Sequence, residues 1–284
     1  MILITGATGQ LGSAIIKNLL ETEHKSNLVA LVRDTEKAKE LADLGVKIKV
    51  GNYFDKESLD SAMKDIEKVL LISSSDFNNR LQQHKNVIDA AAQNNVKHIY
   101  YTGVHLKNIE TSPLKPVLGD HFETEDYIKS KKINYTFLRN NLYMEVLPMF
   151  LGQNVKNTGI FLPAKDGKVN FVSREDLAKV TAKIIASENF IDPIYNLCGK
   201  KAYSFTEIAE ILSHQNQSDI KYTSPEIETF TATLANFGVP EHLIHVTLAF
   251  AAGMSNQDFD VTDDTLDNIL NNNSTSLENY LKTL

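Results

Sequence analysis

Cysteine is nearly absent from this chain, whose 284 residues contain only Cys198. A single cysteine excludes an intrachain disulfide bond and is typical of a reducing compartment. Met1 also leads directly into an apolar segment, without the charged region and cleavage site of a secretory signal. From these absences we expect a cytoplasmic protein.

Excess basic charge and long apolar runs are lacking as well. The net charge is −7, whereas phosphate contacts require basic patches, so we expect no nucleic-acid partner. The longest apolar stretch, residues 243–254, is interrupted by His245 and is shorter than the about 20 residues that span a bilayer. We therefore expect no membrane span. The stretch fits a buried helix, a pocket wall or a contact in a homodimer.

Motifs of several enzyme classes are also missing. The eight histidines are scattered, and no His/Cys cluster has the spacing of metal ligands. The sequence has no GxSxG elbow and no P-loop. We expect no metal site, and the chemistry must depend on other residues.

What the chain does have is a regular alternation of short apolar runs and helical patterns. Its 42% of hydrophobic and 23% of charged residues indicate a globular protein with a real core. Strands are predicted at residues 1–4, 28–32, 46–50, 69–73, 98–103, 135–139 and 194–198. Helices are predicted from residue 11 onward and at 35–44, 58–63, 81–93, 120–131 and 174–187. This alternation predicts an α/β fold, a Rossmann-like doubly wound parallel sheet with helices on both faces.

The rhythm loosens after residue 139, and from residue 204 the patterns are mainly helical, at 205–214, 226–237 and 241–253. We therefore predict a nucleotide-binding domain at residues 1–150, to which 165–200 return. Residues 151–164 and 201–284 are predicted to form a smaller, mainly helical lobe on the substrate side.

Glycines fill the turn between the first strand and the first helix. Gly6, Gly9 and Gly12 form a GxxGxxG pattern, which differs from the GxGxxG of the standard dinucleotide fingerprint. A tight turn without a ligand is one interpretation. The strand–turn–helix context favours the other, in which the free N–H groups of the helix start bind a phosphate.

Cations follow the second strand, where dinucleotide domains distinguish NAD from NADP. Arg33 and, one turn on, Lys37 suit a 2′-phosphate, whereas an acid here would bind the ribose of NAD. Asp34 is such an acid, but its place before a helix favours an N-cap. The pattern therefore favours NADP.

A candidate catalytic residue lies near the start of the helix at 120–131. An ordinary histidine titrates in the range that lets a side chain pass protons, so we expect that His121 could do so, although it also fits a polar residue beside the cap Asp120. The same helix contains Tyr127 and Lys131, spaced as in the Tyr-x-x-x-Lys pair of short-chain dehydrogenases. That pair lies at the end of the helix, away from the expected site, so we interpret it as a chance match.

Polar residues end several other strands. Because these ends share one edge of a parallel sheet, we expect them near the ligand. Each also has a purely structural interpretation, as a polar turn or a helix cap. An aromatic substrate could stack on the tyrosine among them. They are Ser73, Ser74, Ser75, Thr102, Asn140, Asn141 and Tyr143.

Taken together, the motifs resemble the atypical short-chain dehydrogenases of the NmrA-like family. The resemblance rests on GATGQLG, LVRDTEKA, LLISSS, HIYYTG, HFETE and YTFLRNNLY, and more loosely on SREDLA and YNL further on. Within the family, the sequence is most similar to the bacterial NAD(P)H-dependent quinone oxidoreductases and to triphenylmethane reductase.

The resemblance implies an NADPH-binding domain and direct hydride transfer, without flavin, to a quinone or similar planar small molecule. It implies that Gly6, Ala7, Thr8, Gly9, Gln10, Leu11 and Gly12 hold the pyrophosphate and that Arg33 holds the 2′-phosphate. It places Ser73–Ser75, Asn140 and Asn141 around the nicotinamide and its ribose. The family also includes regulators that bind the dinucleotide without turnover, so a redox sensor is the alternative. A reductase of another small aromatic or imine substrate is a third reading.

Overall fold

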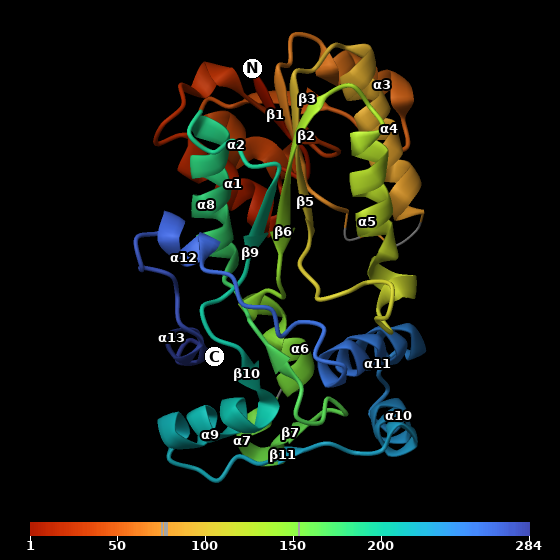
Figure 1. Ribbon diagram of the computed structural model, residues 1–284, viewed down its shortest axis with the longest axis vertical. Helices are drawn as coiled ribbons and strands as arrows, with labels where there is room; N and C mark the ends of the chain where they lie inside the picture. Colours follow the sequence, from red (N-terminus) through yellow and green to blue (C-terminus); the bar gives the residue numbers. More distant parts are fainter. Residues whose placement is uncertain (75, 77–78, 153) are drawn as a thin grey trace. The chain divides into compact units, whose positions relative to one another are not determined.

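The computed structural model describes residues 1–74, 76, 79–152 and 154–284, which form two compact units (Figure 1). Unit 1 consists of Met1–Val104, Asp120–Arg139 and Arg174–Asn196. Unit 2 consists of His105–Gly119, Asn140–Ser173 and Leu197–Leu284. Four segments predicted for the nucleotide-binding domain belong to unit 2, namely residues 105–119, 140–150, 165–173 and 197–200, so unit 2 is nearly as long as unit 1.

Unit 1 is built around a seven-stranded sheet with the order β3-β2-β1-β4-β5-β6-β9. The strands are β1 Ile2–Ile4, β2 Leu28–Val32, β3 Lys47–Val50, β4 Lys68–Leu71, β5 His98–Val104, β6 Asn134–Asn140 and β9 Ile194–Leu197. All pairs from β3 to β5 are parallel, and Leu3 lies opposite Val29 on one side and Val69 on the other. The strand order reverses between β1 and β4, which is the switch point where such sheets bind ligands.

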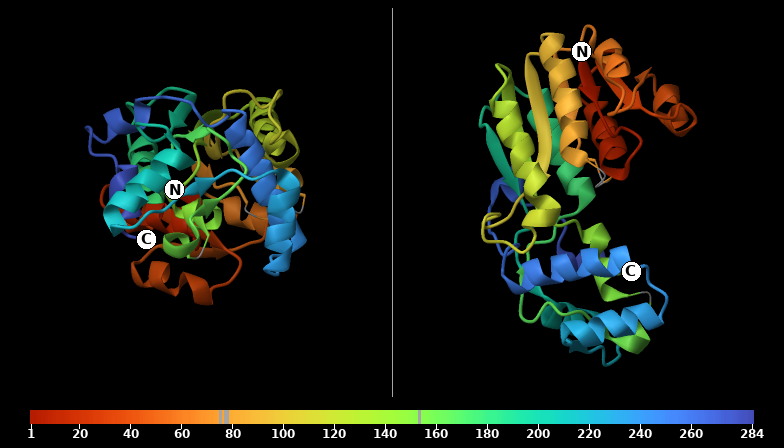
Figure 2. Two further views of the ribbon diagram at one scale, coloured as in Figure 1. Left: turned by 90° about the horizontal axis from the view of Figure 1, so that it is seen from below. Right: turned by 90° about the vertical axis from the view of Figure 1, so that its right-hand side faces the viewer.

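Helices cover both faces of this sheet. The helices are α1 Gln10–Leu19, α2 Lys39–Asp43, α3 Lys56–Met63, α4 Arg80–Gln93, α5 Lys115–Lys129 and α8 Arg174–Ala186, with short 3-10 turns at Lys25–Asn27 and Glu36–Ala38. Helices α1 and α8 lie side by side on one face, and α3, α4 and α5 lie on the other (Figures 1 and 2). This arrangement confirms the predicted Rossmann-like sheet.

Two predicted helices have different bounds in the structure. α5 begins at Lys115 instead of residue 120, because Pro116 falls in its first turn, where a missing N–H costs no hydrogen bond. Residues 35–44 form a 3-10 turn followed by the short helix α2 instead of one continuous helix.

The core of unit 1 lies between the sheet and helices α3, α4 and α5. Leu3, Val29 and Val69 from the strands meet Leu59 of α3 and Ile88 of α4, and all five are fully buried. Because both faces of the sheet are covered, the central strands are apolar along their whole length. The ring of Tyr101 belongs to this core.

Unit 2 combines short helices with two small two-stranded sheets, β8–β10 and β7–β11. Its elements are a 3-10 turn at Met144–Val146, α6 Leu147–Leu151, α7 Val155–Thr158, β7 Ile160–Phe161, β8 Lys168–Val169, β10 Tyr203–Ser204, α9 Phe205–Asn216, β11 Tyr222–Thr223, α10 Ile227–Asn236, α11 Glu241–Ser255, α12 Thr265–Ile269 and α13 Leu277–Leu281. Aromatic rings join them, as where Phe150 packs edge-on against Phe205 with centroids 6.3 Å apart. Among the described residues, no helix has the length and apolar character to cross a membrane.

Candidate functional site

The glycine turn after β1 requires glycine at two positions. Gly6 has a φ of +58°, in the left-handed region that side chains oppose. A Cβ on Gly12 would lie 2.3 Å from the carbonyl oxygen of Gly6, so only glycine lets α1 start this close to the turn. The turn therefore follows β1 closely, and its backbone lies at the switch point between β1 and β4.

The start of α1 has no capping side chain, because its N-cap is Gly9. The N–H groups of the first turn, which no helix can satisfy internally, are left for an outside partner. Thr8, Gly9 and Gln10 are exposed, whereas Ala7 and Leu11 are buried. Of the predicted pyrophosphate residues, Ala7 and Leu11 can therefore offer only backbone groups.

After β2, Arg33 and Lys37 are both exposed. Asp34 uses its carboxylate locally, accepting a hydrogen bond from the N–H of Glu36 at 3.0 Å. The N-cap position of the 3-10 turn is Thr35, so Asp34 forms a local turn one residue before it and is not the predicted N-cap. Burial raises the pKa of the nearby Tyr53 to about 12, and the positive charge of Arg33 acts in the opposite direction.

The residues after β4 are held by buried side chains. The N–H of Ser73 donates to the hydroxyl of Thr102 at 2.9 Å, and the N–H of Ser74 donates to Nε2 of His84 at 3.2 Å. Thr102 lies inside β5 and is buried, so its hydroxyl supports the end of β4. The predicted Ser75 lies outside the described residues.

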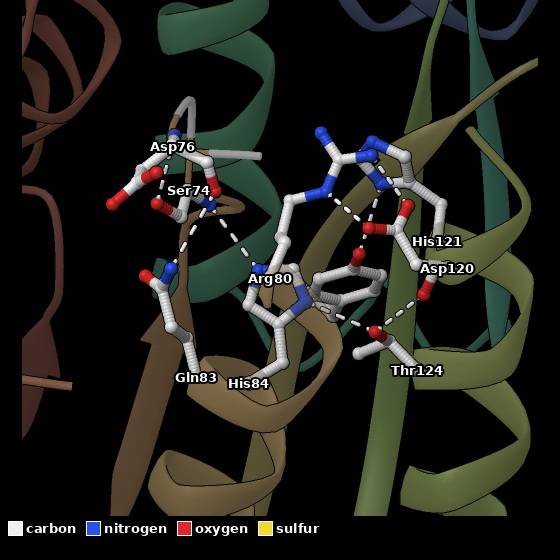
Figure 3. A network of polar contacts seen from close by, with 9 residues as sticks. Ser74, Asp76, Arg80, Gln83, His84, Asp120, His121 and Thr124 are labelled. Atoms are coloured by element: carbon white, nitrogen blue, oxygen red, sulfur yellow. Dashed lines mark hydrogen bonds and ion pairs between the residues drawn. The ribbon is translucent and has the colours of Figure 1, made fainter. Parts of the chain in front are cut away.

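His84 of α4 joins this strand end to α5 (Figure 3). The hydroxyl of Thr124 donates to the backbone carbonyl of Asp120 at 2.7 Å, so it must accept at its 2.9 Å contact with Nδ1 of His84. The hydrogen of His84 is therefore on Nδ1, and Nε2 accepts from Ser74. Burial, followed by the charge of Arg80, lowers the pKa of His84 to about 4, so the ring is neutral at physiological pH.

Arg80 and Asp120 form a second link between α4 and α5 (Figure 3). Nε of Arg80 donates to Oδ2 of Asp120 at 2.6 Å, and Nη2 donates to Oδ1. Arg80 is almost completely buried. A two-pronged ion pair of this kind fixes the guanidinium in one orientation.

His121, the predicted catalytic residue, lies beside this ion pair. Its Nδ1 is 2.9 Å from the hydroxyl of Tyr101 in β5. His121 is 8% exposed and Tyr101 is fully buried. Burial and the charge of Arg80 lower the pKa of His121 well below its usual value.

Asn140, Asn141 and Tyr143 lie in unit 2. Asn141 donates to the carbonyl of Phe259 at 3.1 Å and accepts from the N–H of Leu142, so its amide group is used inside the unit. Nδ2 of Asn140 donates to the hydroxyl of Tyr143 at 3.2 Å. Oδ1 of Asn140 is buried and has no hydrogen-bond partner among the described residues.

Tyr127 of α5 and Lys131, which follows the helix, both contact Asp89 of α4. The hydroxyl of Tyr127 donates to Asp89 at 2.8 Å, and Lys131 binds the same carboxylate and lies over the Tyr127 ring. These contacts give the pair a structural role.

The sequence analysis did not identify the residues that surround His121. Arg80, His84 and Tyr101 lie 20 to 41 positions away from it in the sequence. Arg80 and His84 stand four apart near the start of one helix, and this spacing was the only local signal.

The glycine turn at the switch point of a seven-stranded sheet defines a Rossmann-type dinucleotide-binding fold. Comparison with known proteins gives the family. The sequence pattern of the NmrA-like family matches residues 1–281, and this chain belongs to that family.

The similarity to known proteins covers most of the chain. Quinone oxidoreductase 2 of Escherichia coli (strain K12) is 38% identical over 86% of this chain and 84% of its own length. The crystal structure of Citrobacter sp. triphenylmethane reductase complexed with NADP(H) is 35% identical, with a TM-score of 0.93 over 100% of this chain and 99% of that one. The NADPH complex of an NADPH-dependent quinone oxidoreductase from Escherichia coli is 35% identical, with a TM-score of 0.92 over 100% and 99% of the two chains.

Proposed function

We propose that this protein is an NADPH-dependent oxidoreductase that passes hydride directly to a quinone or similar planar acceptor, without flavin. The observation that carries the proposal is the uncapped, glycine-lined start of α1 at the switch point. It occurs in a chain that is 35% identical, over its full length, to a reductase structure complexed with NADP(H). The 38% identity to a quinone oxidoreductase supports the acceptor class.

The residues around the turn suit a dinucleotide. We propose that the backbone from Gly6 to Gly12 holds the pyrophosphate, because free N–H groups and the helix dipole attract anions there. Arg33 and Lys37, both exposed after β2, are proposed to bind the 2′-phosphate. A charge-assisted hydrogen bond contributes roughly 1.5–3 kcal/mol, which is a strong preference for NADPH over NADH.

The nicotinamide end is assigned to Ser73–Ser75, Thr102, Asn140 and Asn141, and the acceptor contact to Tyr143. The buried, unpartnered Oδ1 of Asn140 supports its assignment, because a buried acceptor atom is costly unless a donor binds it. The contacts of Asn141 and Thr102 point to positioning roles for these two residues.

When bound, NADPH supplies the hydride, which is two electrons and one proton. With one proton from solvent, a quinone becomes a hydroquinone, and NADP⁺ remains. Because a quinone accepts hydride readily, this chain's residues have mainly to bind and orient the two reactants. We propose that the acceptor is a small molecule and that the protein is cytoplasmic. A contact in a homodimer is one of the three roles that fit residues 243–254.

The test is to follow NADPH absorbance with purified, flavin-free protein and a panel of quinones. Acceptor-dependent oxidation that added flavin does not increase is the expected result. A control without acceptor measures background oxidation. If NADPH binds but no acceptor consumes it, the proposal is wrong and a redox sensor of the same family explains the site better.

A further inference from the structure

Tyr101 and His121 form a buried hydrogen bond that includes no residue of the glycine turn. The Tyr101 ring packs edge-on against Phe137 in the core of unit 1, with centroids 6.5 Å apart. Its hydroxyl, at the end of the ring, lies 2.9 Å from Nδ1 of His121. The core thus fixes the position of the hydroxyl, and the hydroxyl fixes the orientation of the imidazole.

The hydrogens of this contact can be assigned. The phenol of Tyr101 is fully buried, and Nδ1 of His121 is its hydrogen-bond partner among the described residues. The hydroxyls of Thr124 and Ser73 lie near the phenol, but His121 Nδ1 is the contact with hydrogen-bond geometry, and Oγ of Ser73 has no partner of that geometry. If Nδ1 were the donor, the phenol hydrogen would lose its well-placed acceptor, which costs about 1–3 kcal/mol. The phenol therefore donates, Nδ1 accepts, and a neutral His121 carries its hydrogen on Nε2.

The surroundings keep His121 neutral. Burial and the positive charge of Arg80 both disfavour an imidazolium, and the lowered pKa of His84 means that this neighbour is neutral too. The carboxylate of the adjacent Asp120 is taken by the two-pronged pair with Arg80. That of Glu125, one helical turn on, is paired with Arg139. A neutral imidazole is a hydrogen-bond donor but a very weak acid.

Nε2 of His121 is available to a ligand. Among the described residues it has no hydrogen-bond partner, and it is not one of the fully buried polar atoms that lack one. His84, by contrast, uses both ring nitrogens inside unit 1, at Ser74 and Thr124 (Figure 3). Of these two neighbouring histidines, only His121 therefore has a ring nitrogen that can bind a ligand.

We propose that Tyr101 is a positioning residue that fixes the hydrogen of neutral His121 on Nε2, and that this N–H donates to the acceptor oxygen on which negative charge develops. The proposal rests on the proposed function and deepens it. The acceptor carbonyl takes up hydride from NADPH, which becomes NADP⁺, and the resulting oxyanion takes a proton from solvent. His121 keeps its own hydrogen, and its contribution is to stabilise the oxyanion.

The first measurement is the tautomer of His121, read from two-bond hydrogen–nitrogen correlations in ¹⁵N-histidine-labelled protein without cofactor. We expect the hydrogen on Nε2 and an Nδ1 signal shifted as for an accepting nitrogen. In Tyr101→Phe this shift should vanish, and the form with hydrogen on Nδ1 should gain population. Tyr195→Phe is the matched control, because it removes the hydroxyl of another buried tyrosine of unit 1, which accepts a hydrogen bond from the backbone N–H of Asp192. A wild-type ring with its hydrogen on Nδ1 overturns the proposal.

The second measurement compares two substitutions of His121 in single-turnover reduction of 1,4-naphthoquinone. The amide nitrogen of Gln reaches the position of Nε2, whereas that of Asn reaches only the position of Nδ1. We expect His121→Gln to keep most of the hydride-transfer rate, and His121→Asn to lose roughly ten- to hundredfold, with NADPH Kd unchanged. Equal rates for the two variants, or a loss of NADPH binding equal to the loss of rate, overturn the proposal.

The two measurements also separate this inference from the proposed function. Protein with hydrogen on Nε2 that oxidises no NADPH with any quinone would contradict the proposed function. Active protein with hydrogen on Nδ1 would contradict only the proposed role of Tyr101 and would leave the proposed function in place.

Discussion

Arg33 and Lys37 are exposed cations. Because exposed charges contribute little to stability, we expect these two to act on cofactor affinity. We predict that Arg33→Ala raises the Kd for NADPH about ten- to hundredfold and leaves the Kd for NADH nearly unchanged, because only NADPH has a 2′-phosphate. Fluorescence titration with both cofactors measures this. Lys132→Ala, which removes an exposed charge after α5, is the control. Equal weakening for both cofactors would contradict the assignment of Arg33.

Residues at the site were predictable to different degrees. Gly6, Gly12 and Arg33 follow from the sequence because their chemistry depends on neighbours in the chain, in a turn or at a strand end. The role of Tyr101 could not be predicted in this way. The residues next to it form a buried strand, and nothing in that strand indicates which side chain its hydroxyl contacts. Only the packing of α5 against β5 puts its hydroxyl beside His121.

Helix α1 depends on its close approach to the turn. We predict that Gly12→Ala destabilises the protein by about 1–3 kcal/mol and abolishes tight NADPH binding, because its Cβ would meet the backbone oxygen of Gly6. Gly119→Ala is the matched control: its Cβ would make an ordinary 3.5 Å contact with Lys115, and alanine favours a helix by about 0.5–1 kcal/mol. Urea unfolding and NADPH titration of both variants give the comparison. A Gly12→Ala protein as stable as the wild type would show that the turn can move.

Elements were predictable where one periodicity extends over many residues. The strands of unit 1 and helices α1, α4 and α8 have nearly the expected bounds, because their buried faces dictate the apolar spacing. The start of α5 was not predicted, since Pro116 and Gly119 are typical of loops and only the packing of the helix outweighs them. The short elements of unit 2 have too few residues to show a period.

Folding lowers the pKa of three histidines, His84, His98 and His121, and so keeps them neutral. Burial is the main cause for each, and the pKa values of His84 and His98 both fall to about 4 in the folded state. Unfolded chains therefore bind more protons below pH ~6.5. The stability that depends on neutral histidines is fully present above that pH and is lost as the pH falls toward 4. The loss from His84 alone is about 3 kcal/mol.

We predict that His84→Gln reduces this dependence of the unfolding free energy between pH 7 and pH 4 by the share of His84 and leaves the shares of His98 and His121 in place. Chemical denaturation at several pH values measures the slope. His242→Gln, at an exposed position of α11, should leave the slope close to that of the wild type. A His84→Gln protein with the wild-type slope would show that other groups cause the acid sensitivity.

The chain passes between the two units five times, and this has a consequence for how the protein can change during evolution. A single recombination point cannot exchange one unit for another, because any cut divides at least one of them. Removing the segment Leu197–Leu284 would leave His105–Gly119 and Asn140–Ser173 without the rest of their unit. New acceptor preferences should therefore arise among relatives by substitutions within an intact chain, and the two units should be inherited together.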